Sequence, residues 1–333
     1  MQKLSVVIPN WNGKDLLTAC LASLQNQTQA AQVIVVDNGS TDGSVELIKK
    51  NFSQVILVEL PKNRGFAAGV NVGIRRALAD GADLIALLNN DALAEKDWLE
   101  QLASTAQSLP EVGIIASKLM HTDKSHFDST GELFYSWGTP GPRGRGKPDA
   151  GQYNQTEYVF GGSGGSSAYR SKMLEQIGLF DEDFFAYYED ADLSFRAQLA
   201  GWKVYYQSSA VVYHHINATS GRVRGMHAYH MAKNMPWVIW KNMPLKLLPI
   251  TLLKFSLYYS VVLAGLAGQG LGFYALKGFA VSLFLLPKKL IQRQAIQHRR
   301  TVSTTYIKSL FSPGLPPGTT KLAKLLSVFG VGV

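Results

Sequence analysis

Residues 33–44 read VIVVDNGSTDGS, an uninterrupted apolar run that ends in an acidic, glycine-bearing turn and leads into a helix. The runs LSVVIPN at residues 4–10 and LIALLNND at residues 84–91 end in polar residues in the same way. Strands whose apolar residues follow one another without alternation are buried on both faces, as in parallel sheets covered by helices. The first third of the sequence therefore predicts the α/β fold class.

Length and composition exclude several classes of protein. The 333 residues are 46% hydrophobic and 17% charged, which excludes a peptide, a coiled coil and low-complexity disorder. Cys20 is the single cysteine, so no internal disulfide can form and a reducing cytoplasm is the expected compartment. The short apolar run near the N-terminus predicts a first strand rather than an export signal.

Polar side chains follow the predicted strands, where ligands bind in open α/β sheets. Asp37 is placed to accept hydrogen bonds from a base or a ribose, although Asp-Asn-Gly is also a good turn former. Asp91 is placed to bind a hard divalent cation, but one carboxylate is a poor metal site. His214 and His215 end another strand-like run and are candidate partners, with a purely structural role as the alternative.

The densest group of ionisable side chains is FDEDFFAYYEDADL at residues 180–193. Solvated surfaces rarely interleave carboxylates with phenylalanine and tyrosine, so we interpret this segment as part of a site. Glu189, Asp190 and Asp192 fall in the first turn of a predicted helix, where the helix dipole favours ionised carboxylates. An ionised aspartate near apolar walls is a plausible general base.

Two glycine-bearing segments have different predicted roles. Residues 62–73, KNRGFAAGVNVG, carry three glycines spaced four apart, which lets a helix pack tightly and opens its N-terminal amides to an anion. Residues 138–151, GTPGPRGRGKPDAG, predict a mobile loop without regular structure. That loop is either a solvated surface excursion or a lid that grips a phosphate.

Charge is divided unevenly along the chain. All 24 acidic residues lie at or before Asp192, together with 16 of the 33 basic ones, so this part carries a net charge of −8. The remainder carries 17 basic residues and no acidic one. This asymmetry predicts an anionic partner, and the apolar composition of the basic part favours an anionic membrane surface over nucleic acid.

Residues 255–276 contain no charged side chain, and these 22 residues are close to the ~20 that span a bilayer as a helix. A basic cluster typical of a juxtamembrane segment follows: Lys288, Lys289, Arg293, Arg299 and Arg300. A membrane-inserted hairpin, an interfacial helix pair and a buried pair covering the rest of the protein all remain open.

Seven motifs occur in a fixed order: VVIPNWN (6–12), VVDNGSTD (35–42), NRGFA (63–67), LNND (88–91), FDEDFF (180–185), YEDADL (188–193) and HH (214–215). Together they resemble the inverting glycosyltransferases of the GT-A fold, family 2, and especially the rhamnosyltransferase-like members that build bacterial surface polysaccharide. The likeness covers about residues 4–225. It implies a Rossmann-like mixed sheet, with a catalytic domain over residues 1–235 and a membrane-associating helical region over 236–333.

The resemblance also implies roles for individual residues. The expected nucleotide-sugar-binding set is Pro9, Asn12, Asp37, Asn63, Gly65, Asn71, Asn90 and Asp91. Asp91 would hold Mg²⁺ or Mn²⁺ on the donor diphosphate with His214 or His215, of which His214 is preferred. Asp190 would be the catalytic base, assisted by Glu189, while Asp192 would lie on the acceptor side.

The implied reaction is inverting, non-processive transfer of one sugar, with rhamnose favoured, from a dTDP- or UDP-sugar to a polyprenyl-linked saccharide at the cytoplasmic face of the cell membrane. The sequence departs from the family in two ways. Asn89 stands where many relatives carry aspartate, which predicts weaker metal binding, and no Gln-x-x-Arg-Trp signature of processive synthases follows His215.

A non-catalytic, nucleotide-binding scaffold of a polysaccharide assembly complex is the alternative. A degenerate copy should have lost the Glu189–Asp190 pair or Asp91, and both are present.

Overall fold

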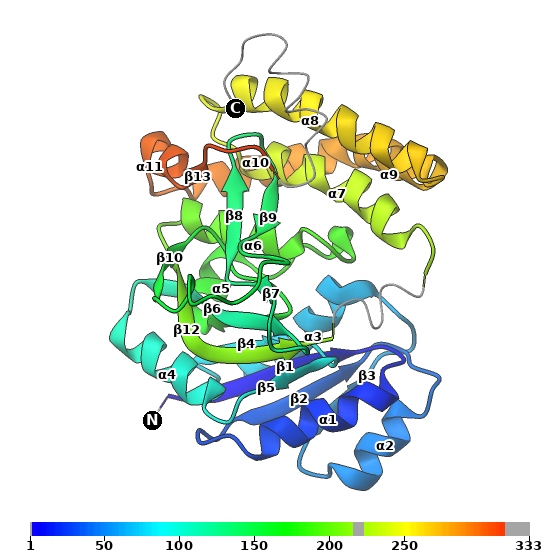
Figure 1. Cartoon of the computed structure of the whole chain (residues 1–333), viewed down its shortest axis with the longest axis vertical. Coiled ribbons are helices and arrows are strands. Elements are labelled where there is room, and N and C mark those ends of the chain that lie inside the picture. Colours follow the sequence, from blue (N-terminus) through cyan, green and yellow to red (C-terminus); the bar gives the residue numbers. More distant parts are fainter. Residues whose placement is uncertain (1, 216–222, 317–333) are drawn as a thin grey trace.

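The computed structural model describes residues 2–215 and 223–316, and within them the centre of the molecule is a ten-stranded mixed sheet (Figure 1). The main path of the sheet runs through β10 (Glu157–Val159), β12 (Lys203–His214), β6 (Val112–His121), β11 (Ser166–Arg170), β4 (Leu84–Leu88), β1 (Leu4–Asn10), β2 (Gln32–Asp37) and β3 (Ile56–Glu59). Two short strands complete it, β5 (Ala92–Ala94) on β12 and β7 (Phe127–Ser129) on β6.

The predicted parallel arrangement holds for β4, β1, β2 and β3. β11 then runs antiparallel to both of its neighbours, β4 and β6, which makes the sheet mixed. Because β2 lies on one side of β1 and β4 on the other, the strand order reverses at β1. The crevice at the carboxyl ends of such strands is where ligands bind in open sheets, so Pro9, Asn10 and Asn89 to Asp91 converge there.

Two apolar layers hold helices against the sheet. One layer contains α1 (Lys14–Gln25), α2 (Ser44–Asn51) and α4 (Trp98–Ser108), and the other contains α3 (Gly65–Ala79), α5 (Ser171–Ile177) and α6 (Glu189–Leu199). The glycine spacing of α3 brings that helix close to the sheet, because a Cβ at Gly73 would lie 2.4 Å from Val7 Cγ1 and 3.0 Å from Val36 Cγ2. The prediction of tight packing at this helix is therefore confirmed.

The C-terminal region is a stack of helices at one end of the molecule (Figure 1). It comprises α7 (Met226–Asn242), α8 (Leu248–Gly268), α9 (Gly272–Phe284), α10 (Leu286–His298) and α11 (Thr304–Ser309). A third apolar layer joins this stack to the part of the chain that forms the sheet and its helices, with Phe184 and Phe195 on one side and Trp237 and Tyr259 on the other. The two parts thus share one core.

The predicted boundary between residues 235 and 236 falls inside α7. Pro236 lies within this helix and lacks the N–H that would bond four residues back. That acceptor, Ala232 O, takes a hydrogen bond from the Tyr259 hydroxyl instead, at 2.6 Å, and the helix runs on to Asn242. Part of the predicted membrane region, residues 317–333, lies outside the described residues.

The apolar run at residues 255–276 is not one helix. Within the described residues α8 is the one helix long and apolar enough to cross a membrane, by length and composition only, and it ends at Gly268 before a turn leads into α9. One side of α8 is buried, through Phe255, Tyr258 and Tyr259 among others. Its other side exposes Ile250, Leu253 and Leu257.

The segment at residues 138–151 contains regular structure, contrary to the prediction. Within it β9 (Pro140–Pro142) pairs with β8 (Glu132–Tyr135), and β13 (Phe311–Ser312) joins the far edge of β8 to complete a small sheet. Arg143 is buried and bonds to Thr130 O, which anchors the segment.

One residue of the basic cluster, Lys289, is paired inside the protein, whereas Lys288 and Arg299 are exposed. Lys289 is fully buried and lies 2.8 Å from Asp181 Oδ2 and 2.7 Å from Asp183 Oδ2. Lys241, on α7, lies 2.7 Å from Asp181 Oδ2 and 2.8 Å from Asp192 Oδ1. Part of the charge asymmetry is therefore balanced inside the protein, where Lys241 and Lys289 pair with carboxylates of the acidic segment.

Candidate active site

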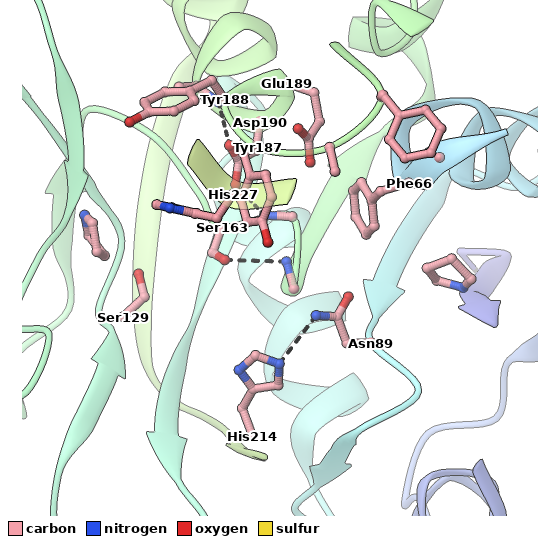
Figure 2. Close-up of a pocket in the computed structure, with 18 of the residues that line it drawn as sticks. Phe66, Asn89, Ser129, Ser163, Tyr187, Tyr188, Glu189, Asp190, His214 and His227 are labelled. Atoms are coloured by element: carbon pink, nitrogen blue, oxygen red, sulfur yellow. Dashed lines mark hydrogen bonds between the residues drawn. The ribbon is translucent and has the colours of Figure 1, made fainter. Parts of the chain in front are cut away.

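A cavity of about 420 Å³ opens at the carboxyl ends of β1 and β4. Its walls include five of the predicted site residues from the first half of the chain: Pro9, Asn63, Gly65, Asn90 and Asp91. Glu189, Asp190 and His214 also line it. Figure 2 draws Asp190 and His214 at opposite ends of the same pocket. The cavity therefore brings together segments separated by more than a hundred residues.

The ends of β2, β1 and β4 are tied together by a chain of amides. Asn90 Nδ2 donates to Asn10 Oδ1 at 2.7 Å, and Asn10 Nδ2 donates to Asp37 Oδ1 at 3.0 Å. Asp37 is buried, accepts a second bond from Ser40 N, and does not line the cavity. Asn12 lies in the adjoining turn, where its Oδ1 accepts from Thr41 N. These two residues support the pocket wall in this structure rather than form its surface.

Asp91 and His214 form the candidate metal position. Asp91 Oδ1 is buried, lies 3.1 Å from His214 Nε2 and has no well-aligned hydrogen-bond donor within the described residues. His214 Nδ1 lies 2.8 Å from Asp128 Oδ2, which leaves Nε2 facing Asp91 and, at 3.3 Å, the Asn89 amide (Figure 2). An unsatisfied carboxylate oxygen beside an oriented imidazole fits a divalent cation.

Electrostatics at His214 are set by its two carboxylates. Burial alone would lower the pKa of His214, but the Asp128 and Asp91 carboxylates beside its two ring nitrogens outweigh burial and raise it to about 9. Binding of a cation at Nε2 would therefore displace a proton.

Two amino-acid side chains do not complete a metal site. No group of three or more His, Cys, Asp or Glu side chains arranged to hold a metal occurs in the part of the chain that the structure describes. Mg²⁺ in particular often binds one or two carboxylates and takes its other ligands from substrate phosphate and water. His215 is exposed and does not line the cavity, although its backbone N–H donates to Asp91 O.

Asp190 stands at the start of α6, as predicted, and is held by backbone amides. Its Oδ2 accepts from Gly164 N at 2.9 Å, and its Oδ1 accepts from Ala191 N at 2.8 Å. Burial raises the pKa of Asp190 above its ordinary value, while these amides oppose the rise. Glu189 is more deeply buried, and burial together with the Asp190 charge raises the pKa of Glu189 well above its ordinary value.

The two neighbouring carboxyl groups, Glu189 and Asp190, consequently have different environments. Glu189 Oε2 has no hydrogen-bond partner among the described residues, which favours the protonated, neutral form of this side chain. Asp190 keeps two backbone donors that stabilise its charge. Environments that favour the charged form of one carboxyl group and the neutral form of its neighbour make the charged one the better proton acceptor. Asp190 is therefore the better candidate for a base.

The loop before α6 is strained. Phe185 has φ 67° and ψ −62°, and Ala186 N bonds to Phe184 O, which is a γ-turn of the rare positive-φ kind. Tyr187 and Tyr188 follow with φ of 69° and 71°. Left-handed backbone costs roughly 1–2 kcal/mol for each residue other than glycine, so other contacts must hold this loop in place.

Two further predicted site residues, Asn71 and Asp192, also lie outside the cavity. Asp192 is fully buried, where Lys241, Arg196 and Asn242 surround its carboxylate, so it cannot face an acceptor. Asn71 is 1% exposed and exchanges hydrogen bonds with the backbone of Phe180, so it cannot reach a nucleotide. In this structure both side chains point from their helices into protein rather than into the pocket.

Sequence reasoning missed several residues of the cavity wall: Asn38, Asp128, Glu132, Arg145, Ser163, Gly164 and His227. Asp128 accepts from His214 and also lies 3.0 Å from Arg145. Burial, followed by the Asp190 charge, raises the pKa of Glu132 well above its ordinary value. The glycine-rich segment GGSGG at residues 161–165 was a local signal that could have pointed to this wall.

The sheet, its reversal at β1 and the cavity beyond it are those of the GT-A fold. Solved structures share this fold. Staphylococcus aureus TarS 1-349 in complex with UDP matches with a TM-score of 0.56 at 18% identity, over 95% of each chain. The mannosyltransferase PcManGT from Pyrobaculum calidifontis, in complex with GDP-Man and Mn²⁺, matches with a TM-score of 0.50 at 18% identity, over 92% of this chain and 88% of that one.

Residues 5–178 match the model of glycosyl transferase family 2, and the chain belongs to that family. A curated relative is the N-acetylglucosaminyl-diphospho-decaprenol L-rhamnosyltransferase of Mycobacterium tuberculosis. It is 29% identical over 252 residues, which is 68% of this chain and 81% of the relative. The chain spans 55% of a longer TarS chain.

Proposed function

We propose that this chain transfers a single sugar from a nucleoside diphosphate-sugar to a lipid-linked saccharide during cell-envelope polysaccharide synthesis, with inversion at the anomeric carbon. The observation that carries the proposal is one cavity lined by a partly buried aspartate, Asp190, and by the Asp91–His214 pair. The name of the mycobacterial relative favours rhamnose as the sugar and a polyprenyl diphosphate-linked saccharide as the acceptor. The donor would be a dTDP- or UDP-sugar.

Asp190 would act as the general base. An acceptor hydroxyl within hydrogen-bond distance would lose its proton to the carboxylate as the oxygen attacks the anomeric carbon, and the nucleoside diphosphate would leave from the opposite face. Two backbone amides fix the orientation of Asp190 before the acceptor arrives. Because the raised pKa of Glu189 favours its neutral form, this side chain would place no second negative charge near the attacking oxygen.

Asp91 and His214 would hold Mg²⁺ or Mn²⁺ together with the donor diphosphate. A bound divalent cation would supply charge stabilisation to the diphosphate as it leaves. Asp128 would orient the His214 ring, and Arg145 would add a positive charge at the cavity wall. Asn89 in place of a carboxylate predicts that the cation binds mainly when the nucleotide is present.

The absence of a Gln-x-x-Arg-Trp signature after His215 supports transfer of one sugar rather than processive synthesis. The outer faces of α8 and α9 support a membrane role, since they expose large apolar side chains: Ile250, Leu253, Leu257, Phe273, Leu276, Leu283 and Phe284. Because the opposite face of α8 is part of the shared core, this pair would lie in the interface of the cytoplasmic leaflet rather than span the bilayer.

The test is release of nucleoside diphosphate from dTDP-rhamnose and a panel of UDP-sugars by purified protein, with polyprenyl diphosphate-linked N-acetylglucosamine and Mn²⁺ or Mg²⁺. Release from one donor should depend on the acceptor. It should fall 10²- to 10⁴-fold in Asp190→Asn, the usual contribution of a general base. Asp80→Asn, which alters an exposed ion pair with Arg76, is the matched control and should keep its activity.

The alternative of a nucleotide-binding scaffold predicts binding without turnover. If the wild type and Asp190→Asn both bind UDP or dTDP tightly, and neither releases nucleoside diphosphate from any donor, the result would favour the scaffold over the enzyme.

A further inference from the structure

The strained loop at residues 184–188 is held in place by a residue far away in the sequence. Asn234, on α7, is fully buried against this loop. Its Nδ2 lies 2.9 Å from Phe184 O, 2.9 Å from Ala186 O and 2.8 Å from Tyr187 O. The two N–H donors of one side-chain amide are thus shared among three carbonyl groups of the loop whose backbone is strained.

Other contacts hold the same loop from two sides. Lys233, the neighbour of Asn234, donates from Nζ to Asp183 O at 2.7 Å and to Phe184 O at 3.3 Å. The His230 ring, one turn earlier on α7, stacks on Phe185 with ring centres 5.0 Å apart and planes 7° apart. On the opposite side Ala67 N, in the first turn of α3, donates to Phe185 O. The loop therefore lies between α3 and the C-terminal helix α7.

We propose that Asn234 is a positioning residue for the general base: by holding the strained loop, α7 sets where α6 begins and therefore where the Asp190 carboxylate points. The inference rests on the proposed role of Asp190. Tyr188 is the residue that precedes α6, and Asp192 N bonds to Tyr188 O, so a change in the loop backbone passes directly to the first turn of the helix.

The Asn234 side chain acts only as a hydrogen-bond donor among the described residues. Its Oδ1 is buried and has no hydrogen-bond partner among the described residues, whereas its Nδ2 faces three acceptors. An aspartate has nearly the same shape but cannot donate when ionised, and its charge would repel the three carbonyl oxygens. Asn234→Asp therefore removes the interaction with little change in volume, and Asn234→Ser keeps one donor on a shorter side chain.

Tyr259→Phe is the matched control. It also removes one buried hydrogen bond to α7, at Ala232 O, but among the described residues the Tyr259 hydroxyl bonds to that carbonyl and not to the loop. A general loss of stability in α7 would affect both variants, whereas loss of positioning would affect only Asn234. Thermal unfolding of each variant gives the comparison of stability.

The experiment combines kinetics with hydrogen exchange. For Asn234→Asp we expect kcat to fall at least tenfold, the donor KM to stay within twofold, and amide exchange in residues 184–191 to accelerate at least tenfold. Asn234→Ser should show an intermediate loss, and Tyr259→Phe should resemble the wild type in all three. Equal kcat in Asn234→Asp and the wild type, or equal losses in Asn234→Asp and Tyr259→Phe at equal stability, would overturn the proposal.

Failure of the proposed function gives a different result. If the wild type releases nucleotide from no donor, the role of Asp190 as base fails, and positioning of a base fails with it. Hydrogen exchange would still show whether Asn234 holds the loop. If the wild type is active and exchange in Asn234→Asp changes no more in residues 184–191 than elsewhere, the positioning role alone is refuted.

Discussion

Lys288 and Lys289 are neighbours that both contact Asp183, but they should contribute very differently to stability. Lys289 is fully buried, with its ammonium between Asp181 and Asp183 and 4.6 Å from the centre of the Trp237 ring. Lys288 is 56% exposed and lies 2.7 Å from Asp183 Oδ2. Replacing each by methionine removes the charge while keeping most of the side-chain volume.

The magnitudes follow from burial. Removing one partner of a buried ion pair usually costs 3–5 kcal/mol because the remaining charge is left uncompensated. Asp181 would keep Lys241 and Asp183 would keep Lys288, so we expect the lower end for Lys289→Met, about 3 kcal/mol. An exposed pair contributes about 0–1 kcal/mol, which is the expectation for Lys288→Met.

Urea unfolding followed by tryptophan fluorescence measures both variants, and sedimentation with anionic phosphatidylglycerol vesicles measures their lipid binding. A loss of about 3 kcal/mol lowers the folding equilibrium constant roughly a hundredfold, and 1 M salt should reduce the effect at Lys288 but not at Lys289. Equal stability losses, or a stable Lys289→Met variant that no longer binds vesicles, would refute the structural role and restore the interpretation of a lipid-binding cluster.

Three further predictions concern the active site and α3. Because burial raises the pKa of Asp190, the base should become protonated at a pH above the ordinary aspartate value of about 4, and kcat/KM should already fall there as the pH is lowered. A value of kcat/KM that stays unchanged down to about pH 4 would contradict this. Gly73→Ala should cost about 1–2 kcal/mol in urea unfolding, because its Cβ would overlap Val7, whereas Gly265→Ala in the open part of α8 should not destabilise. Asp128→Asn should weaken Mn²⁺ binding in the presence of UDP by 10- to 100-fold in calorimetry, because it alters the support of the His214 ring, and unchanged affinity would contradict the assigned metal position.

Local features of the sequence predicted the parts of the fold that depend on neighbouring residues. An apolar run that stops at a polar residue fixes a buried strand and its end, which is why β1, β2 and β4 and the positions of Asp37 and Asp91 were found. The start of α6 at Glu189 followed from three carboxylates ahead of a helical pattern. The antiparallel course of β11 left no comparable local signal.

Side-chain direction is where sequence reasoning failed. Asn71 and Asp192 belong to motifs that do reach the cavity, through Gly65 and Asp190, but on a helix residues a few positions apart face different ways. Asp128 was missed for the opposite reason, since its link to His214 joins residues 86 positions apart. Spacing within a motif does not contain that information.

Acidic and basic parts of one sequence can pair with each other inside the protein. Here such pairs indicate that the C-terminal region is part of the same core and not only an anchor. Its lysines at 241 and 289 neutralise aspartates of the same acidic segment that supplies Asp190, and its Asn234 holds the loop between them. A helix that merely anchored a finished enzyme would not need buried charges or amides directed at the catalytic loop. The same stack of helices exposes the apolar faces of α8 and α9, so the proposed contact with a lipid surface and the proposed positioning of Asp190 depend on one continuous piece of structure.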